Sequence, residues 1–200
     1  MPDERIGALL FVAVGPVPPA VVSDVAARVS RAISVPCRVA AATAEIATAP
    51  VDGRAQVDAD RLLVEVERLA AHGDAVLAAL VASDMGNPLF THFFGRARLG
   101  GRALVVSLAR LSPAFDGLCD DADVAARRAA LEVLHELGHV AGLRHCADAR
   151  CLMSLAHTVD AIDVRGTTWC GACSGHLPRE LRGVGIPDGL DDGPGPGMKR

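Results

Sequence analysis

The chain has 200 residues, a formal net charge of −4 and a hydrophobic content of 50%. Its length is enough for one hydrophobic core and leaves little room for a second full domain. No apolar run reaches the roughly 18 residues that a membrane span needs, so we expect a soluble protein without a membrane partner. Lysine and arginine are scattered and tyrosine is absent, which argues against a nucleic-acid partner.

The first predicted element is the apolar stretch Ile6–Val14, which fits a buried strand but also the apolar part of a signal peptide. Ahead of it, Asp3 and Glu4 outweigh Arg5, whereas a signal peptide needs a net positive charge there. We therefore expect a strand, and a cytoplasmic protein that acts as a monomer.

Helices and strands alternate along the next hundred residues. The expected elements are a helix opened by Pro18-Pro19 and running through Ile33, a strand Cys37–Ile46, a helix Asp58–Ala71 closed by Gly73, a strand Ala75–Ala82, and hairpin strands Phe93–Arg98 and Ala103–Leu108 around Gly100-Gly101. The apolar run at Ala75–Ala82 is typical of a strand buried on both faces. The alternation predicts an α/β sheet with an antiparallel pair appended, a fold of the α+β kind.

A long helix is predicted to begin near three acids, Asp120, Asp121 and Asp123, and to run to about Val140. Beyond it the regular periodicity is lost, and Gly183–Gly197 has the composition of a loose tail. We expect a single catalytic domain over residues 1–183, divided into an N-terminal subdomain 1–142 and a C-terminal subdomain 143–183, with a flexible tail at 184–200.

The strongest chemical signal is His135-Glu136-Leu137-Gly138-His139 on the long helix. Imidazoles four residues apart lie one turn apart on the same side of a helix, so both can bind one ion. A catalytic zinc takes three protein ligands and leaves one position for water, so the third ligand must come from outside this turn. Gly142 can end the helix in the left-handed conformation and return His145 to the metal.

Glu136 follows the first predicted ligand and lies beside the metal-facing surface. A bare H-E-x-x-H occurs by chance on amphipathic helices, but Gly142 and His145 solve a geometric problem that the short motif leaves open. Zinc lowers the pKa of a water molecule to about 7, and Glu136 is placed to take a proton from this zinc-activated water and pass it to a leaving amine. The residues predict peptide-bond hydrolysis with Glu136 as general base and no covalent intermediate.

Four of the six cysteines crowd into one stretch, at Cys146, Cys151, Cys170 and Cys173. Four thiolates make a closed tetrahedral zinc site, which would stabilise a segment with little core of its own. Two alternatives stay open, a pair of disulfides or a redox-active C-x-x-C; missing secretion signals disfavour the first, and the lack of a strand-to-helix context at Cys170 disfavours the second. Cys37 and Cys119 stand apart and are expected to be small buried hydrophobes.

The combined pattern resembles that of the archaemetzincins, a family of metzincin-type zinc peptidases. It reads His135-Glu136-x-x-His139-x-x-Gly142-x-x-His145-Cys146-x4-Cys151-x-Met153 and then Cys170-x-x-Cys173. Upstream, Phe93–Ala97 and Val106–Leu111 are similar to the family's strands before the active-site helix. Sixteen residues separate Met153 from Cys170, one fewer than in the family pattern, which implies a slightly shorter loop.

The resemblance implies a metzincin-like mixed twisted sheet with backing and active-site helices over a small irregular C-terminal subdomain. It implies two zinc ions, one catalytic and bound by the three histidines, the other structural and bound by the four cysteines. It also implies that Glu136 serves as base and acid, that Met153 forms a Met-turn beneath the metal, and that the substrate is a peptide or protein. The strand around Phe93–Arg98 would be the cleft's edge, where an extended peptide pairs by strand addition.

Two functions remain as alternatives: a peptidase that cuts within chains or trims N-termini, and a zinc-stabilised peptide-binding protein with little hydrolytic activity. The presence of Glu136 favours the peptidase. Met153 also fits ordinary core packing. The remaining histidines lie outside the motif and are expected to be surface or satisfied core residues: His72, His92, His157 and His176.

Overall fold

The computed structural model describes residues 6–41, 46–71 and 75–182. Its main sheet has five strands in the order β2-β1-β4-β7-β6, and β3 and β5 form a second, two-stranded sheet. The strands are β1 (Ala8–Val14), β2 (Cys37–Val39), β3 (Val57–Asp58), β4 (Ala75–Val81), β5 (Met85–Gly86), β6 (Gly95–Ala97) and β7 (Ala103–Ser107). In the main sheet β2, β1, β4 and β7 run parallel, and the edge strand β6 is antiparallel to β7. This confirms the expected mixed sheet with an appended antiparallel pair.

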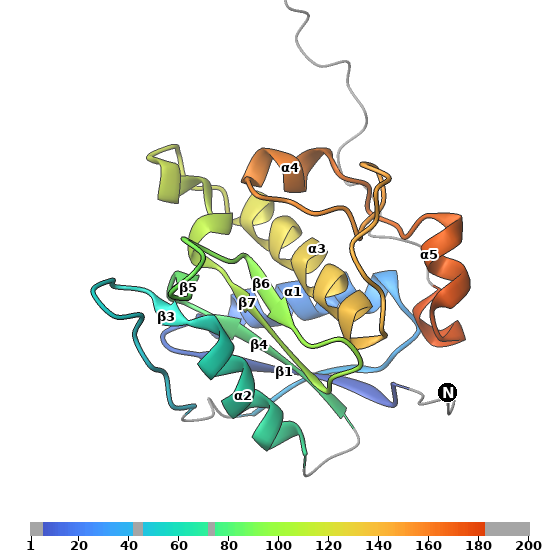
Figure 1. Cartoon of the computed structure of the whole chain (residues 1–200), viewed down its shortest axis with the longest axis horizontal. Coiled ribbons are helices and arrows are strands. Elements are labelled where there is room, and N and C mark those ends of the chain that lie inside the picture. Colours follow the sequence, from blue (N-terminus) through green and yellow to red (C-terminus); the bar gives the residue numbers. More distant parts are fainter. Residues whose placement is uncertain (1–5, 42–45, 72–74, 183–200) are drawn as a thin grey trace, which may run out of the picture.

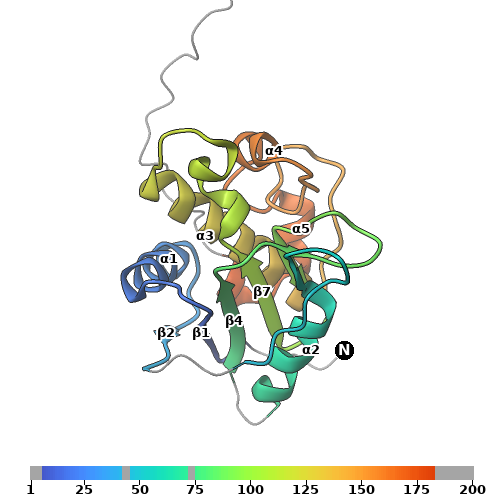
Figure 2. The same cartoon turned by 90° about the vertical axis from the view of Figure 1, so that its left-hand side faces the viewer.

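Helices cover both faces of the sheet (Figure 1). The helices are α1 (Pro19–Ala32), α2 (Ala59–Ala70), α3 (Ala122–Val140), α4 (Val159–Val164) and α5 (Gly171–His176), with 3-10 turns at η1 (Ala109–Leu111), η2 (Pro113–Asp116) and η3 (Arg179–Leu181). One core contains Leu9 and Phe11 of β1 with the apolar faces of α1 and α3, and the other contains Val12 and Val14 with α2. Figure 2 shows α1 and α3 on the side of the sheet opposite to α2.

The predicted elements of the N-terminal half are present with small changes at their ends. The strand expected at Ile6–Val14 is β1, the first helix ends at Ala32, and the second begins after Asp58, whose side chain caps it. The strand expected at Ala75–Ala82 is β4, and Val76–Val81 are buried, which confirms burial on both faces. Gly73 and residues 42–45 lie outside the described residues.

The length expected for the Cys37–Ile46 strand is wrong, because β2 ends at Val39. The reason is its position at the edge of the sheet, where it pairs with only three residues of β1, Leu9 to Phe11. After the backbone N–H of Ala40 donates to the carbonyl of Phe11 at 2.9 Å, the ladder ends. An apolar composition alone therefore overestimated how far the pairing extends.

Helix α3 has the start and the end that its sequence predicts. At the start, the carboxylate of Asp121 accepts hydrogen bonds from the backbone N–H groups of Asp123 and Val124. At the end, Gly142 has a φ of 91°, its N–H donates to the carbonyl of His139, and the N–H of Leu143 donates to that of Gly138. This bond pattern is a Schellman motif, which turns the chain sharply back along the helix.

Beyond α3 the described chain contains the short helices α4 and α5 and the turn η3, joined by long irregular connections. These segments pack against α3 through Leu152, Met153, Ile162 and Leu177, which are buried in the same core as α1. The tail predicted at Gly183–Gly197 lies outside the described residues. Within the described ranges, none of the helices combines the length and apolar character of a membrane span.

Candidate metal centres

The structure brings His135, His139 and His145 together, with one ring nitrogen of each within 4.8 Å of the other two. His135 and His139 lie on α3, and the Schellman turn at Gly142 returns His145 to the same point. The Nε2 atoms of His139 and His145 are 3.3 Å apart. Two ligands of a tetrahedral zinc with bonds of about 2.0–2.1 Å are separated by about 3.3 Å. The spacing of this pair therefore fits a single zinc ion.

Backbone carbonyls orient two of the three imidazoles. His135 Nδ1 lies 2.8 Å from the carbonyl oxygen of Leu152, and His139 Nδ1 lies 2.7 Å from that of Leu143. A carbonyl oxygen can only accept, so both Nδ1 atoms carry the proton and both Nε2 atoms keep a free lone pair. Burial lowers the pKa of all three imidazoles, which favours the neutral form that binds metal. Neutral nitrogens with converging lone pairs are a donor set suited to a cation.

Glu136 lies on α3, and its side chain faces the edge strand β6. Its side chain is buried, and a Cβ atom on Gly95 of β6 would stand only 2.6 Å from Glu136 Oε1. Burial, and then the charge of Glu132, raise the pKa of Glu136 well above its ordinary value, against opposing effects of Arg165 and Arg96. A carboxyl group with a raised pKa can both accept and hold a proton near neutral pH.

Met153 is fully buried. Its sulfur packs against α3 at Gly138, where a Cβ atom would overlap Met153 Sδ. The carbonyl of Met153 accepts a hydrogen bond of 2.9 Å from the N–H of Cys146, so this turn also holds the segment that follows His145. Its packing fits both the Met-turn expectation and ordinary core packing, which describe the same contacts.

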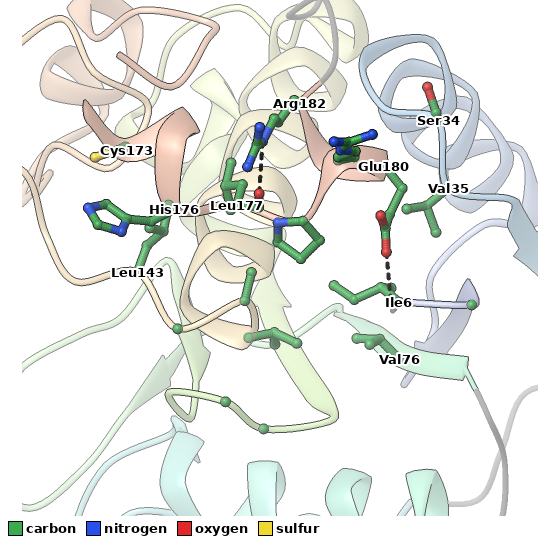
Figure 3. A pocket seen from close by; sticks show the side chains of 18 of the residues that line it. Ile6, Ser34, Val35, Val76, Leu143, Cys173, His176, Leu177, Glu180 and Arg182 are labelled. Carbon is green, nitrogen blue, oxygen red and sulfur yellow. Dashed lines mark hydrogen bonds between the residues drawn. The ribbon is translucent and has the colours of Figure 1, made fainter. Parts of the chain in front are cut away.

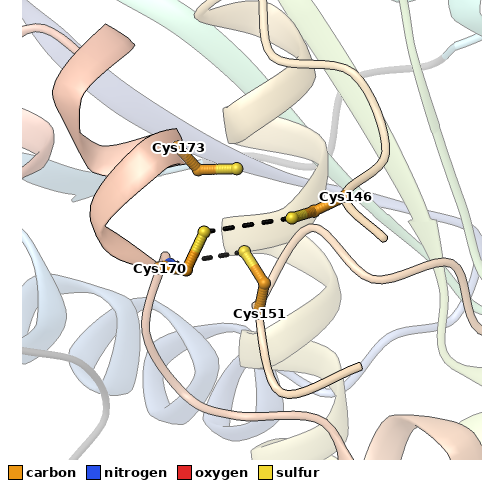
Figure 4. A group of neighbouring side chains, drawn as sticks. All are labelled: Cys146, Cys151, Cys170 and Cys173. Atoms are coloured by element: carbon orange, nitrogen blue, oxygen red, sulfur yellow. Dashed lines mark hydrogen bonds between the residues drawn. The ribbon is translucent and has the colours of Figure 1, made fainter. Parts of the chain in front are cut away.

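The four clustered cysteines form a second group, in which the Sγ atoms all lie within 4.8 Å of one another; they are Cys146, Cys151, Cys170 and Cys173. Figure 4 shows the four thiols pointing toward one another from two irregular segments and from the start of α5. Cys146 Sγ and Cys170 Sγ are 3.9 Å apart, far longer than a disulfide bond of about 2 Å. Burial raises the pKa of Cys151, and hydrogen bonds that its Sγ accepts from the N–H groups of Met153 and Cys170 offset this in part.

The family model described as Peptidase family M54 matches residues 21–179, well over half of the chain. The chain belongs to peptidase family M54. Both ligand clusters lie inside the matched region. The family is described as one of peptidases, and the histidine and cysteine clusters of this chain indicate zinc as the metal.

Members of family M54 from archaea are similar to this chain. An archaemetzincin of Methanocaldococcus jannaschii is 44% identical over 80 residues, which are 40% of this chain and 45% of that protein. An archaemetzincin of Halobacterium salinarum is 36% identical in an alignment 163 positions long, which covers 76% of this chain and 93% of that protein. The match thus spans less than half of the first relative and nearly all of the second.

The fold of this chain is also similar to that of a solved archaemetzincin structure. The crystal structure of archaemetzincin from Methanopyrus kandleri aligns with a TM-score of 0.69 at 28% identity, over 91% of this chain and 98% of that one. The predicted resemblance to archaemetzincins and the expected mixed α/β fold are therefore confirmed. The individual roles of the histidines, of Glu136, of Met153 and of the cysteines stay predictions.

Sequence reasoning missed four residues of this M54 site. Gly95 and Gly138 leave room for the side chains of Glu136 and Met153. Glu132 and Arg165 form a buried ion pair beside His135. One signal was available: Glu132 stands four residues before Glu136, on a helix that is expected to be largely buried, where a carboxylate needs a partner.

The other histidines and cysteines lie apart from the two clusters. His92 is satisfied, with Nε2 3.2 Å from the carbonyl oxygen of His157, and His157 and His176 are exposed, as expected; His72 is outside the described residues. The expected burial of Cys119 is wrong, because it lies between η2 and α3 in a stretch, residues 114–123, that is exposed throughout. Cys37 is half-buried at the edge of the sheet.

A cavity of about 1550 Å³ lies beyond the C-terminal end of α3 (Figure 3). Its lining includes Leu143, Cys173, His176 and Leu177, and Glu180, whose carboxylate accepts a hydrogen bond from the N–H of Ile6. None of the three clustered histidines lines it. The cavity therefore marks the junction of the C-terminal segments with α3 and β1, away from the histidine cluster.

Proposed function

We propose that this M54 protein hydrolyses peptide bonds with a catalytic zinc bound by His135, His139 and His145. The observation that carries the proposal is the convergence of three neutral imidazoles beside the buried carboxyl group of Glu136. A zinc ion bound there would polarise a peptide carbonyl and lower the pKa of a water molecule to about 7.

Glu136 serves as the general base and then as the acid. Its raised pKa, caused first by burial, lets the carboxylate take a proton from water and keep it until the amine leaves. Its contact with Gly95 fixes the carboxylate on the side of the site that faces β6. A peptide-binding protein without hydrolytic activity would need no such group, so the peptidase is the function that we favour.

An extended peptide substrate would add to the open edge of β6. Among the described residues this strand pairs with β7 alone, which leaves its other side available for strand addition. Ion pairs from Arg96 and Arg98 to carboxylates of α2, at 2.8 and 3.0 Å, hold the strand from the opposite face of the sheet. A peptide paired there would run past Glu136, because Gly95 of β6 lies directly against it.

The four cysteines would bind a second, structural zinc, so that each chain holds two ions. The backbone N–H of Cys173 lowers the pKa of Cys170 to about 7, which favours a thiolate ligand. This second ion would fasten a C-terminal subdomain of residues 143–183 to residues 1–142, within one catalytic domain followed by the tail 184–200. Reduced thiols suit a monomer that works in the cytoplasm without a nucleic-acid partner.

Comparing Glu136→Gln with the parent tests the peptidase. A broad peptide library incubated with each protein and read by mass spectrometry should show cleavage by the parent and none by the variant. Glu65→Gln is the matched control, because it also turns a carboxylate into an amide but lies half-buried on α2, on the other side of the sheet from α3. Absence of cleavage by the parent, or equal cleavage by Glu136→Gln, would contradict the proposal.

Metal analysis tests the number of ions. The parent should contain two zinc ions per chain, and a mild chelator should remove one readily because the cysteine site is closed. His139→Ala should lose one ion and keep the other. A parent with a single zinc that disappears in His139→Ala would refute the structural site while leaving the catalytic one.

A further inference from the structure

Helix α3 carries a buried ion pair one turn before Glu136. The carboxylate of Glu132 accepts a hydrogen bond from the Nη2 of Arg165, the residue that follows α4. Both side chains are almost completely enclosed, with exposures of 5% for Glu132 and 2% for Arg165. The pair joins α3 to the chain segment that follows Met153, across 33 positions in the sequence.

Stability alone is a poor explanation for this pair. Removing two charges from water is costly, and apolar residues of similar volume often replace a buried pair without loss of stability. The hydrogen bonding of Arg165 is also incomplete, because its buried Nε has no hydrogen-bond partner among the described residues. A buried, incompletely bonded cation that lies beside a candidate active site calls for a functional explanation.

Arg165 contacts a predicted zinc ligand directly. Its Nη1 lies 3.3 Å from His135 Nδ1, the atom that also faces the carbonyl of Leu152 at 2.8 Å. Because Nδ1 carries its proton toward that carbonyl, Nη1 does not hydrogen-bond to it, and the guanidinium group is a packing neighbour of the imidazole. The imidazole edge that points away from the metal position therefore meets a carbonyl and a guanidinium group. The neighbours of a ligating imidazole set its orientation and its strength as a ligand; here the carbonyl of Leu152 accepts the Nδ1–H, and Arg165 fills the space beside it.

The backbone around Arg165 is fixed. Its N–H donates to the carbonyl of Ala161 at the end of α4, and the next N–H, of Gly166, donates to the carbonyl of Arg150 at 3.0 Å. A Cβ atom at Gly166 would overlap that carbonyl oxygen of Arg150, so the two segments lie as close as glycine allows. These contacts fix the backbone of Arg165 and hence the position of its guanidinium group beside His135.

We propose that the Glu132–Arg165 pair positions His135 as a zinc ligand, with Arg165 bracing the imidazole and Glu132 holding the guanidinium group in place. The inference rests on the proposed zinc site. Neither residue touches the reacting atoms, so both act through His135 as positioning residues.

The same two helical segments supply a matched control. Arg128 of α3 pairs with Asp163 of α4 through bonds of 2.8 and 2.6 Å. This pair links the elements that Glu132 and Arg165 link, but it lies outside the histidine cluster and is more exposed, with 35% exposure at Asp163. Removing it perturbs the attachment of α4 without removing a contact to His135.

The experiment compares the double variant Glu132→Met/Arg165→Met with the control Arg128→Met/Asp163→Met. Chelator competition gives the zinc dissociation constant of the weaker site, the visible spectrum of the Co²⁺-substituted protein reports ligand geometry, and urea unfolding reports stability. We expect the Glu132/Arg165 variant to unfold at a urea concentration no lower than the parent. Its zinc dissociation constant should rise about 10–100-fold with a changed cobalt spectrum. The control should keep the parent's dissociation constant and spectrum.

An unchanged dissociation constant and spectrum in Glu132→Met/Arg165→Met would overturn the inference, as would an equal change in the control. If that variant fails to fold, Arg165→Lys decides, because it keeps the charge beside Glu132 but cannot reproduce the planar fork. It should show a weaker zinc site, and parent-like affinity would overturn the inference. His139→Ala run alongside separates the two proposals: if it loses no zinc, the catalytic site itself is wrong.

Discussion

A side chain at Gly95 is expected to displace the carboxylate of Glu136. An alanine Cβ would lie 2.6 Å from Oε1, 2.7 Å from Cγ and 2.9 Å from Cδ of Glu136. Because non-bonded heavy atoms rest about 3.5–4.0 Å apart, either the glutamate or β6 must move by about 1 Å. Misplacement of a catalytic group by about 1 Å costs about 100-fold, so kcat should fall by that factor, or about 2.7 kcal/mol.

The assay compares Gly95→Ala with the parent on a peptide that the parent cleaves, together with the zinc content. Zinc should remain, because the three atoms nearest to the new Cβ all belong to Glu136 and none to a histidine. Gly175→Ala in α5 is the control, since a Cβ there meets nothing within 4 Å. A parent-like kcat would refute the reasoning. A variant that loses its zinc would show that α3 moved instead of the glutamate.

Two further predictions concern stability. Gly142 has a φ of 91°, a left-handed conformation that costs an alanine about 1–2 kcal/mol. Gly142→Ala should therefore lower the free energy of unfolding in urea by that amount and weaken zinc binding through His145 in chelator competition. Unchanged values of both quantities would contradict this prediction. Burial raises the pKa of Asp84, but hydrogen bonds from Arg110 and Gln56 outweigh this and leave it below the ordinary 3.8. Ionised Asp84 therefore stabilises the folded protein at pH values above 3.8, and this contribution is lost as the pH falls through the pKa of Asp84 in the folded state. The stability difference between the parent and Asp84→Asn should shrink between about pH 6 and about pH 3, and a constant difference would refute this.

The parts of the site that lie within a few residues of one another were predictable. The four-residue spacing of His135 and His139, the Asp121 cap and the glycine at 142 each act over one or two helical turns, where the backbone geometry is known before any packing. The same holds for β1 and β4, whose apolar runs are long enough to require a buried strand. Local rules therefore located the histidine cluster and most of the elements that support it.

Contacts between distant segments were not predictable. Gly95 and Glu136 are 41 positions apart, and nothing in the spacing of either motif indicates that a strand backbone rests on the glutamate. Arg165 likewise stands in a stretch without periodicity, and its partner Glu132 is found only once α4 is packed on α3. The overlong strand predicted at Cys37–Ile46 has a related cause, because the extent of an edge strand depends on its neighbour and not on its own composition.

The position of His145 follows from constraints at both ends of one short connection. On one side the Schellman turn at Gly142 fixes where the chain leaves α3, and on the other the N–H of Cys146 is bound to the carbonyl of Met153. His145 itself is exposed, so packing does little to hold it, unlike the buried His135. The proposed structural zinc on Cys146 would therefore act on catalysis as well as on folding, because it anchors the residue next to the least supported ligand. Loss of the cysteine site should then weaken the histidine site through His145 before it affects His135.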